Sequence, residues 1–197
     1  MCGRYALHAN PEVVALQFGL DALPEFKASY NVCPGSDVLV IRGRRKASLV
    51  RWGSGNRMIN ARSETLTERP AFRNAFRQYR CLVPASGFYE WQSIAGRKQP
   101  WYVSPREEPL FALGGIVLLW QGARSVAIIT TTANVLTAKI HDRMPVLVPA
   151  ASYDTWLGSG DASALLAPAP NDGMQAYPVS LRVNAPANDD AALLQPI

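Results

Sequence analysis

The sequence contains few cysteines, few histidines and no long apolar run. Its three cysteines are an odd number without Cys-x-x-Cys spacing, which favours reduced thiols over a disulfide framework. Its two histidines, His8 and His141, are too few for a structural zinc site, and we expect no metal and no other cofactor. No run reaches the roughly 18 apolar residues that a membrane span needs, and no signal-peptide segment opens the chain. We therefore expect a cytoplasmic protein that does not contact a membrane.

The chain is long enough to bury a core. Its 197 residues are 48% hydrophobic and 18% charged, a balance that suits a globular domain rather than a disordered segment. Neither an internal repeat nor a low-complexity linker divides the sequence. The prediction is therefore a single domain over residues 1–197, and we expect a monomer.

Positive charge is concentrated in one stretch of the chain. The net charge is +5, and residues 42–80 hold eleven basic residues, ten of them Arg, against only Glu64 and Glu68. A guanidinium forms paired hydrogen bonds to phosphate oxygens and stacks on bases, so this composition favours nucleic acid as a partner. The alternative is a solvated basic face that only keeps the protein soluble.

Short extended segments outnumber helices. Proline starts and apolar faces predict helices at 11–18 and from Pro70, with helical turns at 134–139 and 150–157. Apolar and alternating runs predict strands at 2–8, 30–33, 38–42, 47–52, 80–84, 87–91, 101–103, 110–120, 126–132 and 175–183. Gly114 and Gly115 predict a bulge or a close backbone approach. The pattern indicates an α+β, mainly β fold, with an antiparallel barrel or folded sheet and a few short peripheral helices.

Cys2 has a chemistry that no internal residue offers. If Met1 is removed, the α-amine of Cys2 is free and lies two carbons from the thiol. The amine has a pKa of about 7.7–8.0 and the thiol of about 8.5, so useful fractions of both nucleophiles exist at neutral pH. Both can add to the carbon of one aldehyde, first as a Schiff base and then as a five-membered thiazolidine. The alternative is that Cys2 is a small buried residue near the terminus.

Three further polar residues are candidates for the same chemistry. Glu90 lies in a Phe-Tyr-Glu-Trp segment, a setting that removes a carboxyl from water and raises its pKa. His141 can move a proton to or from an oxygen at neutral pH. Asn60, two residues before Arg62, can hold an amine or a thiol by hydrogen bonds. The alternatives are a Glu on the wet face of a strand, a capping or core His, and a turn Asn.

Eight short motifs follow one another along the whole chain. They are residues 1–5 (Met-Cys-Gly-Arg-Tyr), 30–35 (Tyr-Asn-Val-Cys-Pro-Gly), 51–53 (Arg-Trp-Gly), 59–65 (Ile-Asn-Ala-Arg-Ser-Glu-Thr), 80–91 (Arg-Cys-Leu-Val-Pro-Ala-Ser-Gly-Phe-Tyr-Glu-Trp), 129–134 (Ile-Thr-Thr-Thr-Ala-Asn), 141–145 (His-Asp-Arg-Met-Pro) and 179–184 (Val-Ser-Leu-Arg-Val-Asn). Each is weak alone, but together and in this order they resemble the SOS response-associated peptidase (SRAP) domain family, a family of abasic-site processing proteins.

The resemblance implies a fold and an activity. It implies an SRAP-like fold and a lyase-like protein that cross-links its N-terminal Cys to ring-opened abasic sites in single-stranded DNA, near the bacterial nucleoid. It also implies an autopeptidase activity that removes the leading residue. Among the catalytic residues, Cys2 matches the nucleophile, Asn60 the residue that positions it, Glu90 the acid/base, and His141 the residue that assists sugar ring opening and reversal of the link.

The resemblance also implies a DNA groove. The residues that we expect to contact DNA are Arg4, Arg62 and Arg143, which match phosphate-holding arginines, and Trp52, Trp91 and Thr130. One departure concerns segment 54–58, which is shorter than in most relatives. There a longer loop, with further Pro and Trp residues, borders the groove. The shortening affects how a strand or a duplex junction is gripped.

Two functions of other classes fit parts of the sequence. An N-terminal-nucleophile amidohydrolase or peptidase would use Cys2 on a small amide without DNA, and the basic stretch 42–80 argues against it. A non-covalent single-strand binding module would bind with strongly salt-dependent affinity that Cys2 does not affect. Glu90 and His141, as candidate acid/base partners of the Cys2 aminothiol, argue against that module.

Overall fold

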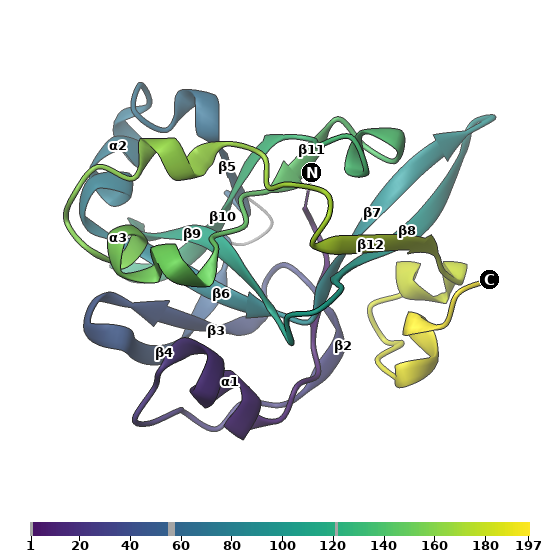
Figure 1. The fold of residues 1–197 in the computed structure, drawn as a ribbon, viewed down its shortest axis with the longest axis horizontal. Helices are drawn as coiled ribbons and strands as arrows, with labels where there is room; N and C mark the ends of the chain where they lie inside the picture. Colours follow the sequence, from purple (N-terminus) through teal and green to yellow (C-terminus); the bar gives the residue numbers. More distant parts are fainter. Residues whose placement is uncertain (1, 55–57, 121) are drawn as a thin grey trace.

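The computed structural model describes residues 2–54, 58–120 and 122–197. Within these residues the chain forms twelve β-strands and three α-helices, joined by loops and 3-10 turns (Figure 1). The helices are α1 (Pro11–Phe18), α2 (Pro70–Gln78) and α3 (Tyr153–Leu157). The strands are β1 (Tyr5–Leu7), β2 (Ser29–Val32), β3 (Asp37–Arg42), β4 (Lys46–Trp52), β5 (Asn60–Arg62), β6 (Arg80–Ala85), β7 (Gly87–Ile94), β8 (Arg97–Pro105), β9 (Phe111–Trp120), β10 (Ala123–Thr132), β11 (Arg143–Pro145) and β12 (Met174–Pro178). None of the helices in these ranges combines the length and the apolar composition that crossing a membrane requires.

Five strands close into a barrel. Their hydrogen-bonded order is β10-β4-β3-β6-β9, and β9 pairs again with β10, which completes the ring. The pairings are antiparallel except that of β4 with β10, a short parallel seam at which Trp52 lies opposite Val126. The expected mainly β fold with a barrel and short peripheral helices is confirmed, whereas the parallel seam was not expected.

A second sheet lies beside the barrel and holds the start of the chain. Its order is β12-β8-β7-β1-β2, with antiparallel pairings throughout. β7 and β8 form a long hairpin that projects from the body of the molecule (Figure 1). Because β1 has partners on both sides, the N-terminal segment is fixed beside the start of β7.

The last part of β10 gathers two short strands. β5 pairs with it in parallel, with Asn60 opposite Ile128 and Arg62 opposite Thr130. β11 pairs with it in antiparallel fashion and ends the barrel sheet. The sequence did not predict β5, because three residues carry no period and form a strand only through this distant partner. Two segments that were expected to carry site residues therefore meet on one strand.

Gly114 and Gly115 let neighbours approach the barrel wall from both sides. A Cβ on Gly114 would lie 2.8 Å from the ring of Trp156, and one on Gly115 would lie 3.0 Å from the sulfur of Cys81. Both distances are shorter than an ordinary van der Waals contact of a Cβ atom, so a larger residue would not fit without movement of its neighbours. The expected close approach is confirmed. Gly114 faces α3 outside the barrel, and Gly115 faces the interior.

The helix starts follow the sequence signals, but the last strand does not. α1 begins at Pro11 and ends before Gly19, whose φ of 60° is left-handed. The strand expected at 175–183 is wrong over its second half, because β12 ends at Pro178 and residues 181–184 form a 3-10 turn. The shortened segment 54–58 includes residues 55–57, which lie outside the described part of the chain.

Candidate active site

The segment before β1 places Cys2 against β7. The backbone N–H of Tyr89 donates to the carbonyl of Arg4 (3.0 Å), so the chain start runs beside the strand that carries Glu90. Cys2 is 0% exposed. Burial raises the pKa of its thiol, and the Glu90 carboxylate raises it further, against a smaller opposing effect of a hydrogen bond from the Arg4 backbone. In this state the Cys2 sulfur is a protonated thiol at neutral pH.

Glu90 is a buried carboxyl beside this thiol. Glu90 is 3% exposed. Burial raises the pKa of its carboxyl, and the smaller effect of His141 lowers it. The expected desolvation is observed, and Trp101 of β8 lies opposite Glu90 in the sheet. Successive residues of a strand point to opposite faces, and Trp91, on the other face, donates through Nε1 to Asn184 (2.8 Å). A carboxyl of raised pKa next to a thiol can act as acid or base near neutral pH.

The turn before β11 holds His141. Its Nδ1 accepts the backbone N–H of Arg143 (3.0 Å), while Asp142 Oδ1 lies 2.9 Å from the same nitrogen. A neutral imidazole cannot use Nδ1 for both contacts, because one needs a lone pair and the other needs a proton. We assign the backbone contact, since the Asp142 side chain is 86% exposed and can rotate away. Nε2 then carries the ring proton, which makes His141 a donor at that position.

Asn60 brings an unused acceptor to the same region. Its Nδ2 makes a long hydrogen bond to the Ile128 carbonyl (3.4 Å), and its Oδ1 is buried with no hydrogen-bond partner in the described residues. A buried acceptor without a donor costs about 1–3 kcal/mol. The site is therefore stabilised when a donor such as an amine or a thiol reaches Asn60. Arg62, two residues further along β5, is exposed.

Arg143 is held by its neighbours. Its guanidinium donates to both carboxylate oxygens of Glu64 and to the carbonyl of Thr130 (2.6 Å). The Arg143 side chain is only 12% exposed, and its hydrogen bonds lower the pKa of Glu64. Glu64 is a site residue that sequence reasoning quoted within a motif but gave no role. The available signal was that it is one of two acids in the basic stretch 42–80.

Two residues that were expected to contact DNA are buried instead. Trp52 is 0% exposed, its Nε1 donates to a backbone carbonyl (2.9 Å), and its ring lies 5.4 Å from that of Tyr5. Thr130 is also 0% exposed. Neither offers surface to a base or a phosphate, so the expectation is corrected for both. Strand alternation places Trp52 in the barrel interior, where it belongs to the core.

Arg4 is used in part by the fold. One of its terminal nitrogens donates to Asn31 Oδ1 and to the Val183 carbonyl, both at 2.7 Å. These bonds join the N-terminal segment to β2 and to the C-terminal part of the chain. A phosphate contact by Arg4 is left to its other donors.

The basic stretch 42–80 is not one free cationic surface. Arg80 is buried and donates to four backbone carbonyls at 2.7 Å each. Arg45 and Arg51 form ion pairs with aspartates. Part of the arginine excess that suggested nucleic acid is therefore structural, and the cations that remain for a ligand must be identified one by one.

Two residues that sequence reasoning did not single out position the His141 turn. Asn134 Oδ1 accepts the N–H and the hydroxyl of Thr137, both at 2.9 Å, and thereby caps the turn. Gln92 Nε2 donates to the Lys139 carbonyl (2.7 Å), which ties β7 to the same turn. An Asn three residues before a Thr in a helical turn is a capping signal, whereas Gln92 carries no signal in the sequence.

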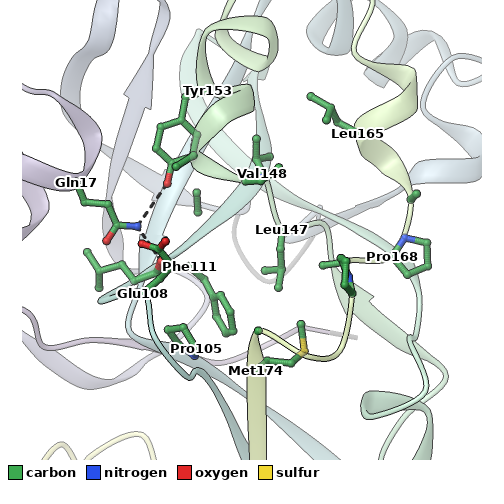
Figure 2. Close-up of a pocket in the computed structure, with 18 of the residues that line it drawn as sticks. Gln17, Pro105, Glu108, Phe111, Leu147, Val148, Tyr153, Leu165, Pro168 and Met174 are labelled. Carbon is green, nitrogen blue, oxygen red and sulfur yellow. Dashed lines mark hydrogen bonds between the residues drawn. The ribbon is translucent and has the colours of Figure 1, made fainter.

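A separate apolar pocket of about 510 Å³ lies between α3 and the segment that leads into β12 (Figure 2). Leu147, Val148 and Leu165 line it, and Gln17 donates to the Tyr153 hydroxyl (3.4 Å) at one end. None of the four catalytic candidates lines this pocket. The candidate active site is therefore the buried Cys2 and Glu90 with the residues of β5, β10 and β11, and not this hollow.

Comparisons with known proteins point to one family. The sequence model of the family described as SOS response associated peptidase (SRAP) matches residues 1–186. The abasic site processing protein YoaM of Bacillus subtilis is 36% identical over 98% of this chain and 97% of its own length. The abasic site processing protein YedK of Escherichia coli is 28% identical over the full length of both chains. A protein from Bacteroides thetaiotaomicron of known crystal structure has a TM-score of 0.86 and 25% identity, with all of both chains covered.

Proposed function

The chain belongs to the SRAP family, and we propose that it processes abasic sites in DNA by forming a covalent bond through Cys2. Relatives of nearly the same length carry the name abasic site processing protein. The bond would join Cys2 to the ring-opened sugar of an abasic site in single-stranded DNA. This reaction makes the protein a lyase-like cross-linking protein.

One observation carries the proposal. Cys2 and Glu90 are buried together, at 0% and 3% exposure, and the Glu90 carboxylate raises the pKa of the Cys2 thiol. A buried thiol in a structural role needs no carboxyl beside it, and a buried carboxyl is costly unless its position serves a purpose. An acid/base group beside a nucleophile is the arrangement that addition to a carbonyl requires.

The reaction begins with removal of Met1, because only then does Cys2 carry a free α-amine. The amine adds to the aldehyde carbon, and the carbonyl oxygen takes a proton and becomes a hydroxyl. Glu90 donates a proton to this hydroxyl, which leaves as water, and the Glu90 carboxylate then takes the remaining nitrogen proton, which gives the imine. The Asn60 Oδ1 acceptor holds the amine during these steps.

The thiol then closes the ring. Its sulfur bonds to the imine carbon and its proton passes to the imine nitrogen, so one water is released per adduct and no oxidant is needed. Because sulfur and imine belong to one residue, the step is intramolecular, and such reactions reach effective molarities of about 10⁵ M or more. The Nε2 proton of His141 serves the sugar oxygen during ring opening and during reversal.

The same groups serve the autopeptidase activity that the family name suggests. Hydrolysis of the bond between Met1 and Cys2 needs a base for water and an acid for the leaving amine, and Glu90 and His141 provide both. The chain would thereby prepare its own nucleophile. Arg62, exposed next to this site, holds a phosphate of the strand.

The test uses Met1-free protein and a single-stranded oligonucleotide with one abasic site. We expect a shifted band on a denaturing gel and an intact mass equal to protein plus oligonucleotide minus one water. Cys2→Ala should abolish the band. The matched control is Cys33→Ala, which removes a partly buried thiol elsewhere and should leave the band unchanged. A band that persists in Cys2→Ala would make a lysine the nucleophile and overturn the proposal.

A further inference from the structure

A second hollow, of about 520 Å³, opens where α2 covers one end of the barrel. We call it the barrel-mouth pocket. Its lining comes from the ends of β3, β9 and β10, from α2 and from the residues around them: Arg42, Met58, Pro70, Asn74, Ala75, Tyr79, Val117, Leu118, Leu119 and Arg124. Its volume lies within the range of about 300–1,000 Å³ that small-ligand sites occupy.

Strand register explains why distant residues meet there. Leu119 pairs with Arg124 and Val117 with Val126, so these side chains share one face of the sheet. Gly115 shares that face too, and it looks into the barrel rather than toward α3. The barrel-mouth pocket is therefore the open end of the barrel interior, and it lies at the start of β10, away from Thr130 at the other end.

The charge of this pocket is not compensated. Its lining includes Arg42 and Arg124 and no acidic residue, and neither arginine forms an ion pair with any described residue. Nε of Arg42 is buried without a hydrogen-bond partner in the described part of the chain. Arg42 also opposes the effect of burial on the pKa of Cys81 inside the barrel, so its charge acts in a dry environment. An uncompensated cation in such surroundings attracts an anion, and the exposed Arg124 adds a second positive charge.

The pocket also offers apolar and aromatic surface. Tyr79 is 49% exposed and Leu119 is 73% exposed, above a floor that includes the buried Val117. An aromatic ring beside arginines is the combination on which a base stacks while its phosphate is held. We propose that the barrel-mouth pocket binds one nucleotide, with its phosphate on Arg42 and Arg124 and its base against Tyr79 and Leu119.

The position of the pocket indicates where this nucleotide comes from. Arg124 lies four residues before Ile128, the partner of Asn60, which is about 13 Å along a strand at roughly 3.3 Å per residue. Stacked nucleotides are spaced by about 3.4 Å along one DNA strand, so about four nucleotides cover this length. The inference that the nucleotide belongs to the strand bound at Cys2 rests on the proposed function. A free nucleotide offers the same chemistry.

The experiment measures affinity without the covalent step. Wild type, R42Q/R124Q and R51Q are titrated with an unmodified single-stranded oligonucleotide of about 12 nucleotides at several salt concentrations. R51Q is the matched control, because Arg51 is an exposed barrel arginine that lies beside the inward-facing Trp52. We expect R42Q/R124Q to lose about tenfold in affinity and about 0.7 in the salt slope, which corresponds to one phosphate. R51Q should change affinity less than about twofold.

A second arm uses thymidine monophosphate, whose binding is measured by isothermal titration calorimetry, with Y79A as a further variant. Loss of mononucleotide binding in R42Q/R124Q and Y79A with unchanged oligonucleotide affinity would support a nucleotide pocket and overturn the strand as its source. No change in either arm overturns the pocket. A wild type that binds through these arginines but forms no cross-link would refute the proposed function and leave the pocket standing.

Discussion

The arginines at the two ends of β10 differ in exposure and in whether an acid compensates their charge. At its C-terminal end, Arg143 is 12% exposed and donates to Glu64 and to the Thr130 carbonyl, so its charge is compensated and its position fixed. At its N-terminal end, Arg124 is exposed and lines the pocket with Arg42, without an acid in the lining. A compensated arginine positions groups and adds little long-range attraction, whereas an uncompensated one adds affinity that salt weakens. We infer that the C-terminal end of β10 belongs to the proposed reaction site, which is dry, and that the N-terminal end contributes to binding.

The largest effect is expected when the buried acid Glu90 is removed from the proposed reaction site. Glu90→Gln should lower the cross-linking rate by about 100-fold or more, the usual contribution of acid–base catalysis. The matched control is Glu107→Gln, an exposed acid after β8, which should react at the wild-type rate. A Glu90→Gln variant that reacts at the wild-type rate would remove the carboxyl from the mechanism.

The same variant has an opposite effect on stability. Because burial raises the pKa of Glu90 in the folded chain, its contribution to stability is fully present below its unfolded pKa, about 4.3. That contribution is lost as pH rises through the raised folded pKa. Glu90→Gln should therefore exceed wild type in free energy of unfolding above that pH, and the difference should disappear in acid. Denaturant titrations across pH measure it, and a Gln variant less stable than wild type at pH 8 would contradict the buried position.

The rates at which the three thiols react test whether the proposed reaction site excludes solvent. In protein that retains Met1, Cys2 and Cys81 are 0% exposed and burial raises both pKa values, whereas Cys33 is partly exposed. Iodoacetamide should modify Cys33 at least about tenfold faster than the other two, since access and thiolate fraction set the rate. Peptide mass mapping over time gives the three rates. Modification of Cys2 as fast as Cys33 would show that the site is open.

Freeing Arg143 from Glu64 should give the C-terminal end of β10 an uncompensated arginine, like the one at its N-terminal end. Glu64→Gln removes the carboxylate that competes with phosphate, so affinity for single-stranded DNA should rise about threefold and the salt slope should steepen by about 0.7, the value for one phosphate. Glu68→Gln is the matched control, because it removes the same charge from an exposed position. Equal effects of the two variants would mean that net charge, and not Arg143, is responsible.

Glu64→Gln should also be slightly less stable than wild type at neutral pH. The folded pKa of Glu64 is lowered by Arg143, so its contribution is present above its ordinary pKa and lost as pH falls through the folded value. The effect is small because the Glu64 side chain is 48% exposed to screening solvent. Thermal unfolding at pH 7 and pH 3 measures the difference, which should be smaller at the lower pH.

The smallest effect is expected in the apolar pocket of Figure 2. This pocket and the barrel-mouth pocket have nearly equal volumes, about 510 and 520 Å³, but only the second is lined by arginines. Leu165→Asn in the first should leave DNA affinity within about twofold of wild type, whereas Leu119→Asn in the second should weaken it several-fold by removing apolar surface from beside a base. Equal losses in the two variants would contradict the division of roles.

Sequence reasoning predicted local features of the chain better than contacts between distant segments. The Pro11 and Pro70 helix starts and the close approach at Gly114 were predictable, because each depends on local backbone chemistry. The desolvation of Glu90 was expected from its aromatic neighbours, and Glu90 is buried in the structure. Segment β5 was not predictable, since it exists only through its pairing with β10.

The candidate site shows the same division. Trp52 in an Arg-Trp-Gly motif was read as a DNA contact, and only the barrel closure shows that it faces inward. Arg42 belongs to the basic stretch 42–80 and Arg124 lies outside it, and only the fold brings both to one pocket. The opposite fates of Arg80 and Arg42, one satisfied by four carbonyls and one not, depend on packing that composition does not contain.

The burial of Cys2 has a consequence during protein synthesis. Glu90, beside which Cys2 is buried, lies on β7 and leaves the ribosome about 4–18 seconds after it, at about 5–20 residues per second. During that interval the bond between Met1 and Cys2 belongs to an unfolded nascent chain, which processing enzymes can reach. Once the sheet has formed around β1, Cys2 is buried, and we expect such enzymes to act on the bond more slowly. Molecules that keep Met1 at that moment would depend on the proposed autopeptidase activity to release the amine.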